Sequence, residues 1–189
     1  MGTLTGSLKQ KQTIQKLFLC FMMYAVLGWC YEVVLETFIY KWGFSNRGVL
    51  FGPYCPVYGV GALTFQFLFR KFKDKKYSLP FEILAKPLLI FLGCMAAATL
   101  IELIASYILE AATGGWPWQT YASYKYNFQA RIALSTSVRF GLGGVLFMYI
   151  VQPSFEWLLS KLSRKALNTT ALVVALIVAA DCIYTFFIK

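Results

Sequence analysis

Five long apolar runs, separated by short segments that carry most of the charge, constrain this chain more than any other feature. A helix needs roughly 20 apolar residues to cross a hydrocarbon core of about 30 Å. Because 59% of the 189 residues are hydrophobic and only 14% are charged, we expect lipid to cover most of the surface. The sequence predicts an all-α integral membrane protein with about five transmembrane helices, in a single polytopic domain. The domain covers residues 1–189, with spans at about 17–40, 53–69, 83–109, 132–151 and 169–188.

The first apolar run follows a polar, basic segment, as the core of a signal peptide does. It is longer than the usual 7 to 15 residues of such a core, lacks a small-residue cleavage site, and carries Glu32 and Glu36. We therefore interpret it as a span that the mature protein keeps.

Lysine and arginine residues predict the orientation in the membrane. Most of the 18 lie in the N-terminal segment, in residues 70–76 with Lys86, and in residues 161–165. Cytoplasmic loops carry an excess of Lys and Arg, so we expect a multi-pass protein of the cell membrane with a cytoplasmic N-terminus and an outer C-terminus. This topology accounts for the net charge of +10, and we expect no nucleic-acid partner.

Residues 46–59 interrupt the apolar pattern with one arginine, three glycines and two prolines. These residue types favour a shaped or re-entrant loop that leads into a helix, which we expect to begin at Pro53. Only about 17 residues separate Pro53 from Arg70, so this second span barely crosses the hydrocarbon core. Irregular backbone at that depth needs protein or a watery cavity around it, which makes the loop the first candidate for a site.

Charged side chains are predicted in the outer half of the membrane on several spans. They are Glu32, Glu36, Glu102, Glu110, Asp181, Arg47, Arg131 and Arg139. One charge at the centre of a span costs about 2.5 to 3.5 kcal/mol, so these groups are expected to face one another or water. They predict one outward-opening polar cavity, towards which the helix at Pro53 points its positive end. The alternative is that Glu and Arg pair only to hold helices together.

A cavity with both signs of charge suits a zwitterionic or anionic solute, or a lipid headgroup. In this hypothesis the charged groups hold the solute, and aromatic rings form part of the wall. The candidate substrate-binding residues are Trp29, Glu32, Glu36, Asn46, Arg47, Tyr58, Glu102, Arg131, Arg139 and Asp181.

The sequence suggests no catalytic residue, metal site or cofactor. It contains no histidine, the commonest general base and metal ligand. The five cysteines form no CxxC pair and are most simply small hydrophobic residues. A disulfide among Cys30, Cys55 and Cys182 stays open, because spacing does not reveal geometry.

An aromatic segment, residues 116–131, precedes the fourth span. Its rings at Trp118, Tyr121, Tyr124 and Phe128 recur at helical spacing, which predicts a short interfacial helix before that span. An aromatic belt at the headgroup level and a gate for substrate both fit this pattern.

Four stretches carry a resemblance to a known family: Leu-Gly-Trp-Cys-Tyr-Glu at 27–32, the loop motif at 46–59, Thr-Leu-Ile-Glu at 99–102 and, more loosely, residues 118–132. With these motifs the chain resembles the CmpB-like family of ABC-transporter type IV membrane proteins. It differs from the family pattern at Gln119, where an acid is usual, and at Ala130, where glycine is usual. The resemblance implies a permease-like transport protein whose ATP hydrolysis, if any, comes from another subunit.

The leading hypothesis is therefore a small membrane transport protein or transporter subunit. Its expected partners are the lipid bilayer and either a separate ATPase subunit or a second copy in a homodimer. One alternative is a membrane-embedded enzyme acting on a lipid headgroup or cell-envelope precursor, with Glu32 or Glu102 as acid or base. Another is a non-catalytic regulatory subunit.

Overall fold

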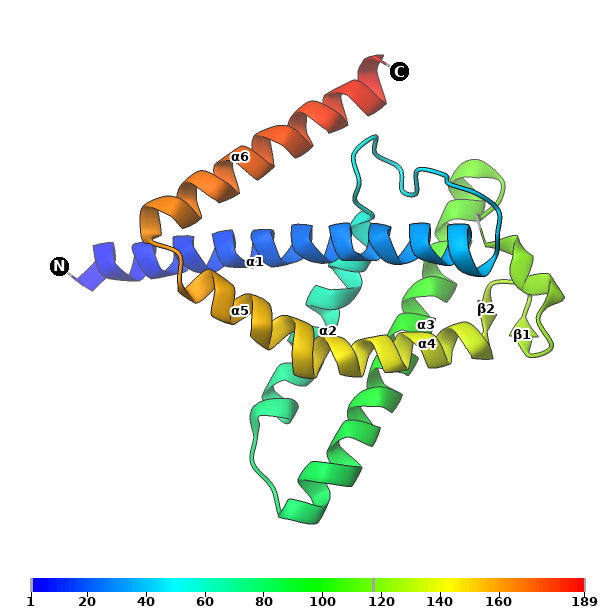
Figure 1. Ribbon diagram of the computed structural model, residues 1–189, viewed down its shortest axis with the longest axis horizontal. Helices are drawn as coiled ribbons and strands as arrows, with labels where there is room; N and C mark the ends of the chain where they lie inside the picture. Colours follow the sequence, from blue (N-terminus) through cyan, green and yellow to red (C-terminus); the bar gives the residue numbers. More distant parts are fainter. Residues whose placement is uncertain (1, 117, 189) are drawn as a thin grey trace. The chain divides into compact units, whose positions relative to one another are not determined.

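The protein is helical over 79% of its length in a computed structural model that describes residues 2–116 and 118–188. The all-helical class is confirmed, with one pair of two-residue strands as the exception. Residues 1, 117 and 189, which belong to the predicted single domain, lie outside the described part. The elements (Figure 1) are α1 (Gly2–Val34), η1 (Leu35–Ile39), α2 (Pro56–Asp74), η2 (Phe81–Ala85), α3 (Lys86–Thr113), η3 (Gln119–Ser123), β1 (Asn127–Phe128), β2 (Ile132–Ala133), α4 (Leu134–Leu146), η4 (Phe147–Val151), α5 (Gln152–Ser160), α6 (Arg164–Ile183) and η5 (Tyr184–Ile188).

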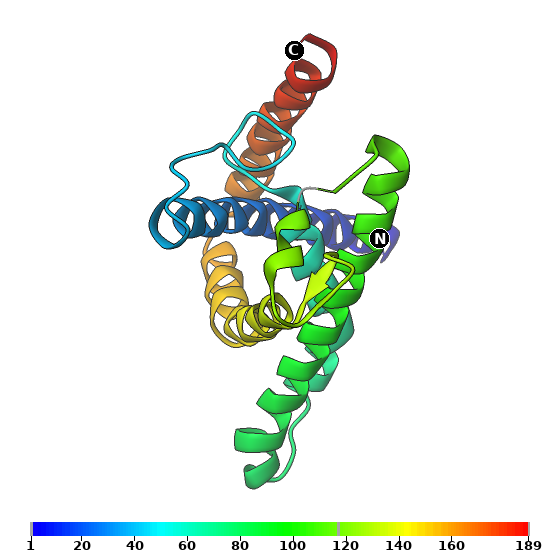
Figure 2. The ribbon, with the colours of Figure 1, turned by 90° about the vertical axis from the view of Figure 1, so that its right-hand side faces the viewer.

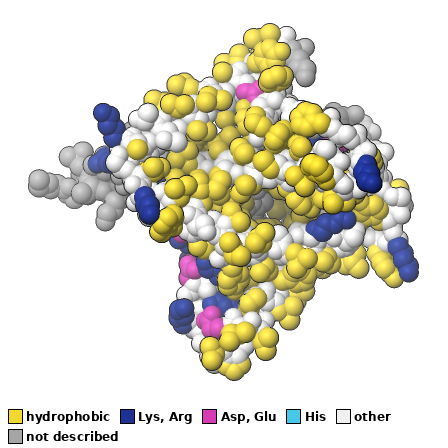
Figure 3. All heavy atoms as spheres, viewed as in Figure 1, with side chains coloured by type: hydrophobic (Ala, Val, Ile, Leu, Met, Phe, Trp, Pro, Cys, Tyr) yellow, Lys and Arg dark blue, Asp and Glu magenta, His cyan; other side chains and the backbone are white. Residues whose placement is uncertain are grey.

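Four helical runs in the described chain are long and apolar enough to cross a membrane: Thr13–Ile39, Phe81–Ala112, Leu134–Ser160 and Arg164–Ile188. Hydrophobic side chains cover most of the face seen in Figure 3, as lipid contact requires. The chain is thus a multi-pass membrane protein. The predicted second span corresponds to α2, whose apolar part before Arg70 is about 21 Å long at 1.5 Å per residue. That length is below the thickness of the hydrocarbon core, and the count of five spans stays a prediction.

The second predicted helix begins at Pro56, three residues after the expected start at Pro53. Proline suits the first helical position, and the residue before a proline avoids the helical conformation. By this criterion either Pro53 or Pro56 could occupy the first position of the helix. The structure selects Pro56 because the Cys55 N–H donates to the Ala25 carbonyl at 2.8 Å, which ties the preceding backbone to α1.

The fourth predicted span does not end near Pro153 but continues to Ser160. A π-helical turn, η4, directly precedes α5 and leads into the proline. Widened turns of this kind re-satisfy backbone groups that a proline would leave unpaired, which allows it inside a membrane helix. A sequence pattern alone reads this proline as a stop.

Two other helix ends have local causes that the sequence carries. Gly114 adopts a left-handed conformation, with φ of 81°, and its N–H donates to the Glu110 carbonyl, so α3 ends where the glycine pair predicts. The α6 helix begins at Arg164 because the Ser163 hydroxyl accepts the Ala166 N–H at 3.1 Å.

The aromatic segment is helical only over Gln119–Ser123, as a short 3₁₀ helix. Beyond it, β1 and β2 form an antiparallel pair, and Gln129 and Ala130 turn the chain with φ of 53° and 55°. The Asn127 side-chain oxygen accepts the Ala130 N–H at 3.0 Å and closes this turn. The expected interfacial helix is therefore shorter than the ring spacing predicts.

The chain divides into two compact units, unit 1 (residues 1–63 and 154–189) and unit 2 (residues 64–153). In unit 1, α1 packs against α6. The core of this packing contains Met22, Ala25, Leu50 and Tyr54, with Phe18, Phe21, Val174, Val178 and Cys182 around them. Two of the buried residues, Leu50 and Tyr54, come from the irregular segment between α1 and α2, so the loop is part of the core.

In unit 2, α3 packs along α4 (Figure 2). Glycine makes this close approach possible: a Cβ added at Gly141 would lie 2.6 Å from the Phe91 ring, and one at Gly144 would overlap Cys94. Small residues at such contacts let helix backbones approach in membranes. The result is a closely packed helix pair that holds both ends of the segment between Thr113 and Leu134.

Candidate functional site

Residues 40–55, here called the connecting loop, join α1 and η1 to α2 in unit 1 without regular structure. Lys41, Gly43 and Gly48 have positive φ values of 56°, 85° and 105°, so the backbone turns sharply several times. The Trp42 N–H donates to the Glu36 carbonyl at 3.0 Å and fixes the start of the loop. The shaped loop expected from the sequence is thus ordered by contacts with its neighbours. Its position in the bilayer stays a prediction.

Glu36 is the buried acid of unit 1. It lies in the π-helical turn η1 and forms an ion pair with Arg47 of the connecting loop. The Ser45 hydroxyl also donates to its carboxylate, at 2.6 Å. A buried charge needs such partners, because removal of one partner of a buried pair costs about 3 to 5 kcal/mol.

Glu32, one helical turn earlier, accepts a hydrogen bond from the Tyr58 hydroxyl. The Tyr58 ring occupies the space above Gly28, where a Cβ would overlap it. On the same helix, the Trp29 indole N–H donates to the Asn46 side-chain oxygen at 2.7 Å. Two side chains of α1 therefore reach the loop or the start of α2.

Asp181 of α6 holds the far end of the connecting loop. It accepts the Gly52 N–H at 2.9 Å, the Phe51 N–H at 3.1 Å, the Tyr54 hydroxyl and the Thr185 hydroxyl. Burial, together with the hydrogen bond to Asp181, raises the pKa of Tyr54 above its ordinary value. The tyrosine therefore stays a neutral donor at physiological pH.

One chain of hydrogen bonds crosses unit 1 from Trp29 through Asn46 to Asp181, while Glu32 with Tyr58 and Glu36 with Arg47 form separate contacts. Asn46 donates to the Phe51 carbonyl at 2.7 Å, and Phe51 in turn donates to Asp181, which connects α1 to α6 through the loop. We call the predicted residues of this group the unit 1 network: Trp29, Glu32, Glu36, Asn46, Arg47, Tyr58 and Asp181. Sequence reasoning missed Ser45, Phe51, Gly52 and Tyr54 as their partners, although Phe51, Gly52 and Tyr54 lie in the loop motif.

The cysteines of the described chain are unbridged. Burial raises the pKa of the Cys55 thiol to about 11, so it is protonated and a poor nucleophile at neutral pH. Among the described residues, no group of three His, Cys, Asp or Glu side chains is placed to hold a metal ion.

Arg131 is a buried charge of unit 2. Its guanidinium lies between the rings of Tyr107 and Trp116, 4.0 Å from each ring centroid, and pairs with Glu110. The Ser106 hydroxyl lies 3.3 Å from its Nη1. The indoles of the aromatic segment complete the arrangement, because Trp118 donates to the Arg131 carbonyl at 2.8 Å. In this geometry Arg131 fixes the aromatic segment against α3.

Glu102 lies two helical turns before Glu110 on α3 and accepts the Tyr121 hydroxyl at 2.8 Å. Tyr121 in turn contacts Tyr124, with ring centroids 5.3 Å apart. The residue chosen from the sequence is thus linked to the 3₁₀ helix η3. Tyr121 was noted only as a ring, and nothing in its spacing indicates a carboxylate partner.

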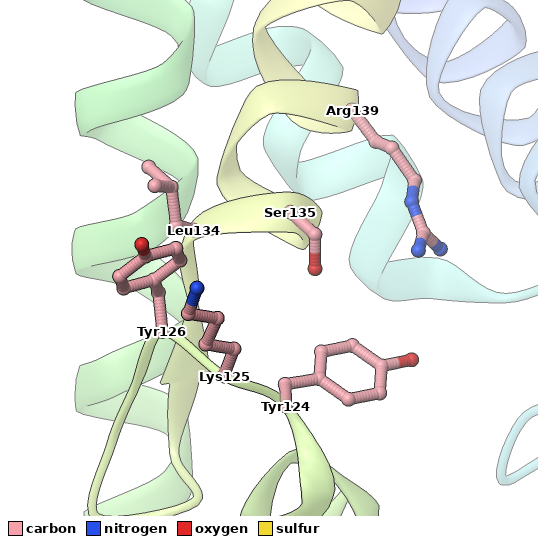
Figure 4. Close-up of a pocket in the computed structure, with 6 residues that line it drawn as sticks. All are labelled: Tyr124, Lys125, Tyr126, Leu134, Ser135 and Arg139. Atoms are coloured by element: carbon pink, nitrogen blue, oxygen red, sulfur yellow. The ribbon is translucent and has the colours of Figure 1, made fainter.

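Arg139, the third candidate in unit 2, lines a groove of about 490 Å³ at the start of α4 (Figure 4). We call this the basic groove; its lining is Tyr124, Lys125, Tyr126, Leu134, Ser135 and Arg139. The run Tyr-Lys-Tyr just before a span is the sequence signal that could have indicated the first three. The structure thus brings seven of the ten candidates together in unit 1 and places Glu102, Arg131 and Arg139 in unit 2. That both groups share one cavity stays a prediction.

The long apolar helices and the buried ion pairs define a polytopic helical membrane protein. The family model described as "Putative ABC-transporter type IV", the CmpB-like family, matches residues 19–186. The chain belongs to this family, and the resemblance noted in the sequence is confirmed. Comparisons with curated proteins and with solved structures found no match.

Proposed function

We propose that this protein is a permease-like component of a transport system in the cell membrane and that it binds a zwitterionic or anionic solute from the outer side. The observation that carries the proposal is the family match over residues 19–186, in a chain with four helices of membrane-spanning length. Together these make the protein transport-related. The solute, its site and the direction of movement are the finer parts of the proposal.

The unit 1 network supplies the binding groups in this proposal. Arg47 supports this role because its side chain is 40% exposed, whereas its partner Glu36 is almost fully buried. A solute carboxylate can therefore approach Arg47 from the open side while Glu36 stays in place. Arginine suits this exchange because its planar fork binds a carboxylate through two hydrogen bonds. Glu32 and Glu36 are the acids available to a cationic group on the same solute.

The proposal also includes the three candidate residues of unit 2 that were predicted from the sequence. Within unit 2, Glu102 and Arg139 would supply opposite charges for a solute, and Arg131 would act by holding the aromatic segment. We further propose that ATP hydrolysis is supplied by a separate subunit, and that the chain works as a homodimer or with that subunit.

A second candidate function is a non-catalytic membrane subunit without a solute. One observation favours it: the carboxylates of Glu32, Glu36 and Asp181 already accept hydrogen bonds from protein groups, and Glu36 also forms an ion pair. Such a network can serve only to hold the loop on α1 and α6. The two candidates predict different results in the same transport assay.

The test is uptake into proteoliposomes that contain the full chain with any protein that copurifies. Radiolabelled amino acids, betaines and dicarboxylates serve as probes. The transport proposal predicts accumulation of at least one probe, loss of that uptake in Arg47→Gln, and normal uptake in Asp74→Asn. Asp74 is a suitable control because it is an exposed acid of unit 2 that pairs with the neighbouring basic residues Arg70 and Lys73 of α2.

Absence of uptake for every probe, with a folded protein and an active copurified ATPase, would support the subunit without a solute. An enzyme is tested in the same preparation by release of a headgroup from labelled phospholipid. Turnover by the purified chain alone would overturn the transport proposal.

A further inference from the structure

We propose that the basic groove of unit 2 binds the phosphate of an anionic glycerophospholipid, with one acyl chain in an adjoining apolar groove. This inference concerns a lipid site and does not depend on the transported solute. Three independent observations carry it: the charges that line the groove, the apolar groove beside it, and the place of the basic groove at the start of a membrane-spanning helical run.

The first observation is the charge of the basic groove. Of the six described residues that line it, Lys125 and Arg139 are cationic and none is acidic. Ser135, one helical turn before Arg139 on α4, contributes a hydroxyl between them (Figure 4). Both residues lie near the N-terminus of α4, where the helix dipole also favours a negative group. These are the groups that recognise a phosphate.

The position of Lys125 also favours the binding of a phosphate in the basic groove. Its Nζ lies 5.2 Å from the centroid of the Tyr126 ring, so the ammonium is held over the rim of the groove. Tyr124 and Tyr126 stand on either side of the lysine in the sequence, and both line the groove. A cation flanked by phenol rings is typical of the headgroup level, where one end of the ring is apolar and the other is wet.

The second observation is an apolar groove of about 440 Å³ that shares Tyr126 and Leu134 with the basic groove. Its other lining residues are Met95, Ala96, Thr99, Leu100, Leu103, Asn127, Phe128, Ile132, Ala133 and Ser137. Leu100, Phe128 and Leu134 are exposed, which provides an apolar surface for a hydrocarbon chain. A soluble phosphate would use the basic groove alone, whereas a lipid uses both.

The third observation is depth. The basic groove lies at the first residues of α4, which begins at Leu134, and at the aromatic segment that precedes them. The α4 helix begins a run long enough to span the membrane, Leu134–Ser160, so its start reaches the headgroup region. A phosphate bound here would be at the depth that phospholipid phosphates occupy.

The charge balance also predicts which phospholipid binds. Two cations attract the single negative charge of phosphatidylglycerol, while the choline group of phosphatidylcholine would place a third positive charge beside them. Each basic residue near an anionic membrane surface contributes about 1 kcal/mol, so removal of both should weaken binding about 30-fold. Lys125→Gln alone should weaken it about fivefold.

The experiment is native mass spectrometry of the purified full chain, titrated separately with phosphatidylglycerol, phosphatidylcholine and inorganic phosphate. The expected result is preferential retention of phosphatidylglycerol, loss of that preference in Lys125→Gln/Arg139→Gln, and no retention of inorganic phosphate. Lys161→Gln/Arg164→Gln removes the same two residue types from the predicted cytoplasmic loop and should leave binding unchanged. Leu134 lines both grooves, so Leu134→Gln should weaken the binding of phosphatidylglycerol although it leaves the charge of the basic groove unchanged.

Several outcomes would overturn the proposal. Equal retention of the two phospholipids would exclude recognition of charge, and inorganic phosphate bound as tightly as the lipid would assign the groove to a soluble anion. Undiminished binding in the double variant would place the lipid elsewhere. If the double variant does not fold, Lys125→Gln decides the matter, because Lys125 lies in an exposed loop and its substitution disturbs no helix.

Discussion

The two units each contain an arginine paired with a glutamate, but the burial of the two partners is reversed. In unit 1 the acid is hidden: the side chain of Glu36 is 3% exposed and that of Arg47 is 40% exposed. In unit 2 the base is hidden: the side chain of Arg131 is 8% exposed and that of Glu110 is 44% exposed. The same chemical pair therefore stabilises two different buried charges.

This difference in burial shows how strongly each buried charge depends on its ion-pair partner. Glu36 depends on Arg47, because apart from that ion pair the Ser45 hydroxyl is the only donor that the described contacts give its carboxylate. Arg131 depends less on Glu110, because two aromatic rings and Ser106 also contact its guanidinium. A buried acid held by a half-exposed loop arginine can exchange that arginine with a solute. A buried arginine stacked between rings is suited to holding structure.

The largest effect is expected for Arg47→Ala. It leaves the Glu36 carboxylate buried without its ion pair, which should lower the free energy of unfolding by about 3 to 5 kcal/mol. Thermal unfolding in detergent measures this loss. The double variant Arg47→Ala/Glu36→Gln should recover much of it, since the buried group is then neutral. A double variant as unstable as Arg47→Ala would show that Arg47 acts through packing and not through charge.

The next effect compares the two arginines directly. Arg131→Lys loses the planar stacking between Tyr107 and Trp116, and we expect a loss of about 1 to 2 kcal/mol. Arg47→Lys keeps a cation beside Glu36 at a half-exposed position and should cost less. The melting temperatures of the two variants test this comparison. A larger loss for Arg47→Lys than for Arg131→Lys would contradict the structural role assigned to the rings.

A smaller effect is expected for Glu110→Gln. The side chain is 44% exposed, so its pairing with Arg131 is screened by the surroundings, and its removal should cost under about 1 kcal/mol. Glu36→Gln serves as the matched variant on the other unit and should also abolish the charge coupling with Arg47. A loss for Glu110→Gln as large as that for Arg47→Ala would remove the distinction between the units.

The smallest effect at neutral pH concerns the thiol beside the connecting loop. Maleimide at pH 7 should spare Cys55, whose burial raises its pKa from 9.0 to about 11. Because the folded pKa lies above the unfolded one, the protonated thiol contributes stability below pH 9 that is lost as pH rises towards about 11. Rapid labelling of Cys55 at pH 7 would show that the loop opens in solution.

The sequence predicts the spans well and the pairing poorly, for a physical reason. Apolar length is a local property, so four of the predicted spans correspond to helical runs of spanning length, and Gly114 ends α3 as the glycine pair indicates. Pro153 lies just beyond the predicted end of the fourth span, at about residue 151, because a proline removes a backbone donor and so favours the end of a helix. The π-helical turn that accommodates it has no comparable signature in the residues.

Partners of buried charges depend on the path of loops, which spacing does not determine. Arg47 and Arg131 were both expected to face a cavity, and only the folded chain distinguishes the one held by a loop from the one held between rings. Asn127 was overlooked in the aromatic segment, although an asparagine that can accept a backbone N–H two or three residues later favours a turn over a helix.

Glycine at position 28 determines which donor the carboxylate of Glu32 can bind. The Tyr58 ring fills the notch that this glycine leaves, and from there its hydroxyl reaches Glu32. Even the methyl group of alanine would displace the ring and leave the neighbouring carboxylate without its donor. Position 28 thus controls the acid one turn away without contacting it, and any chain with a larger residue there would need a smaller ring at position 58.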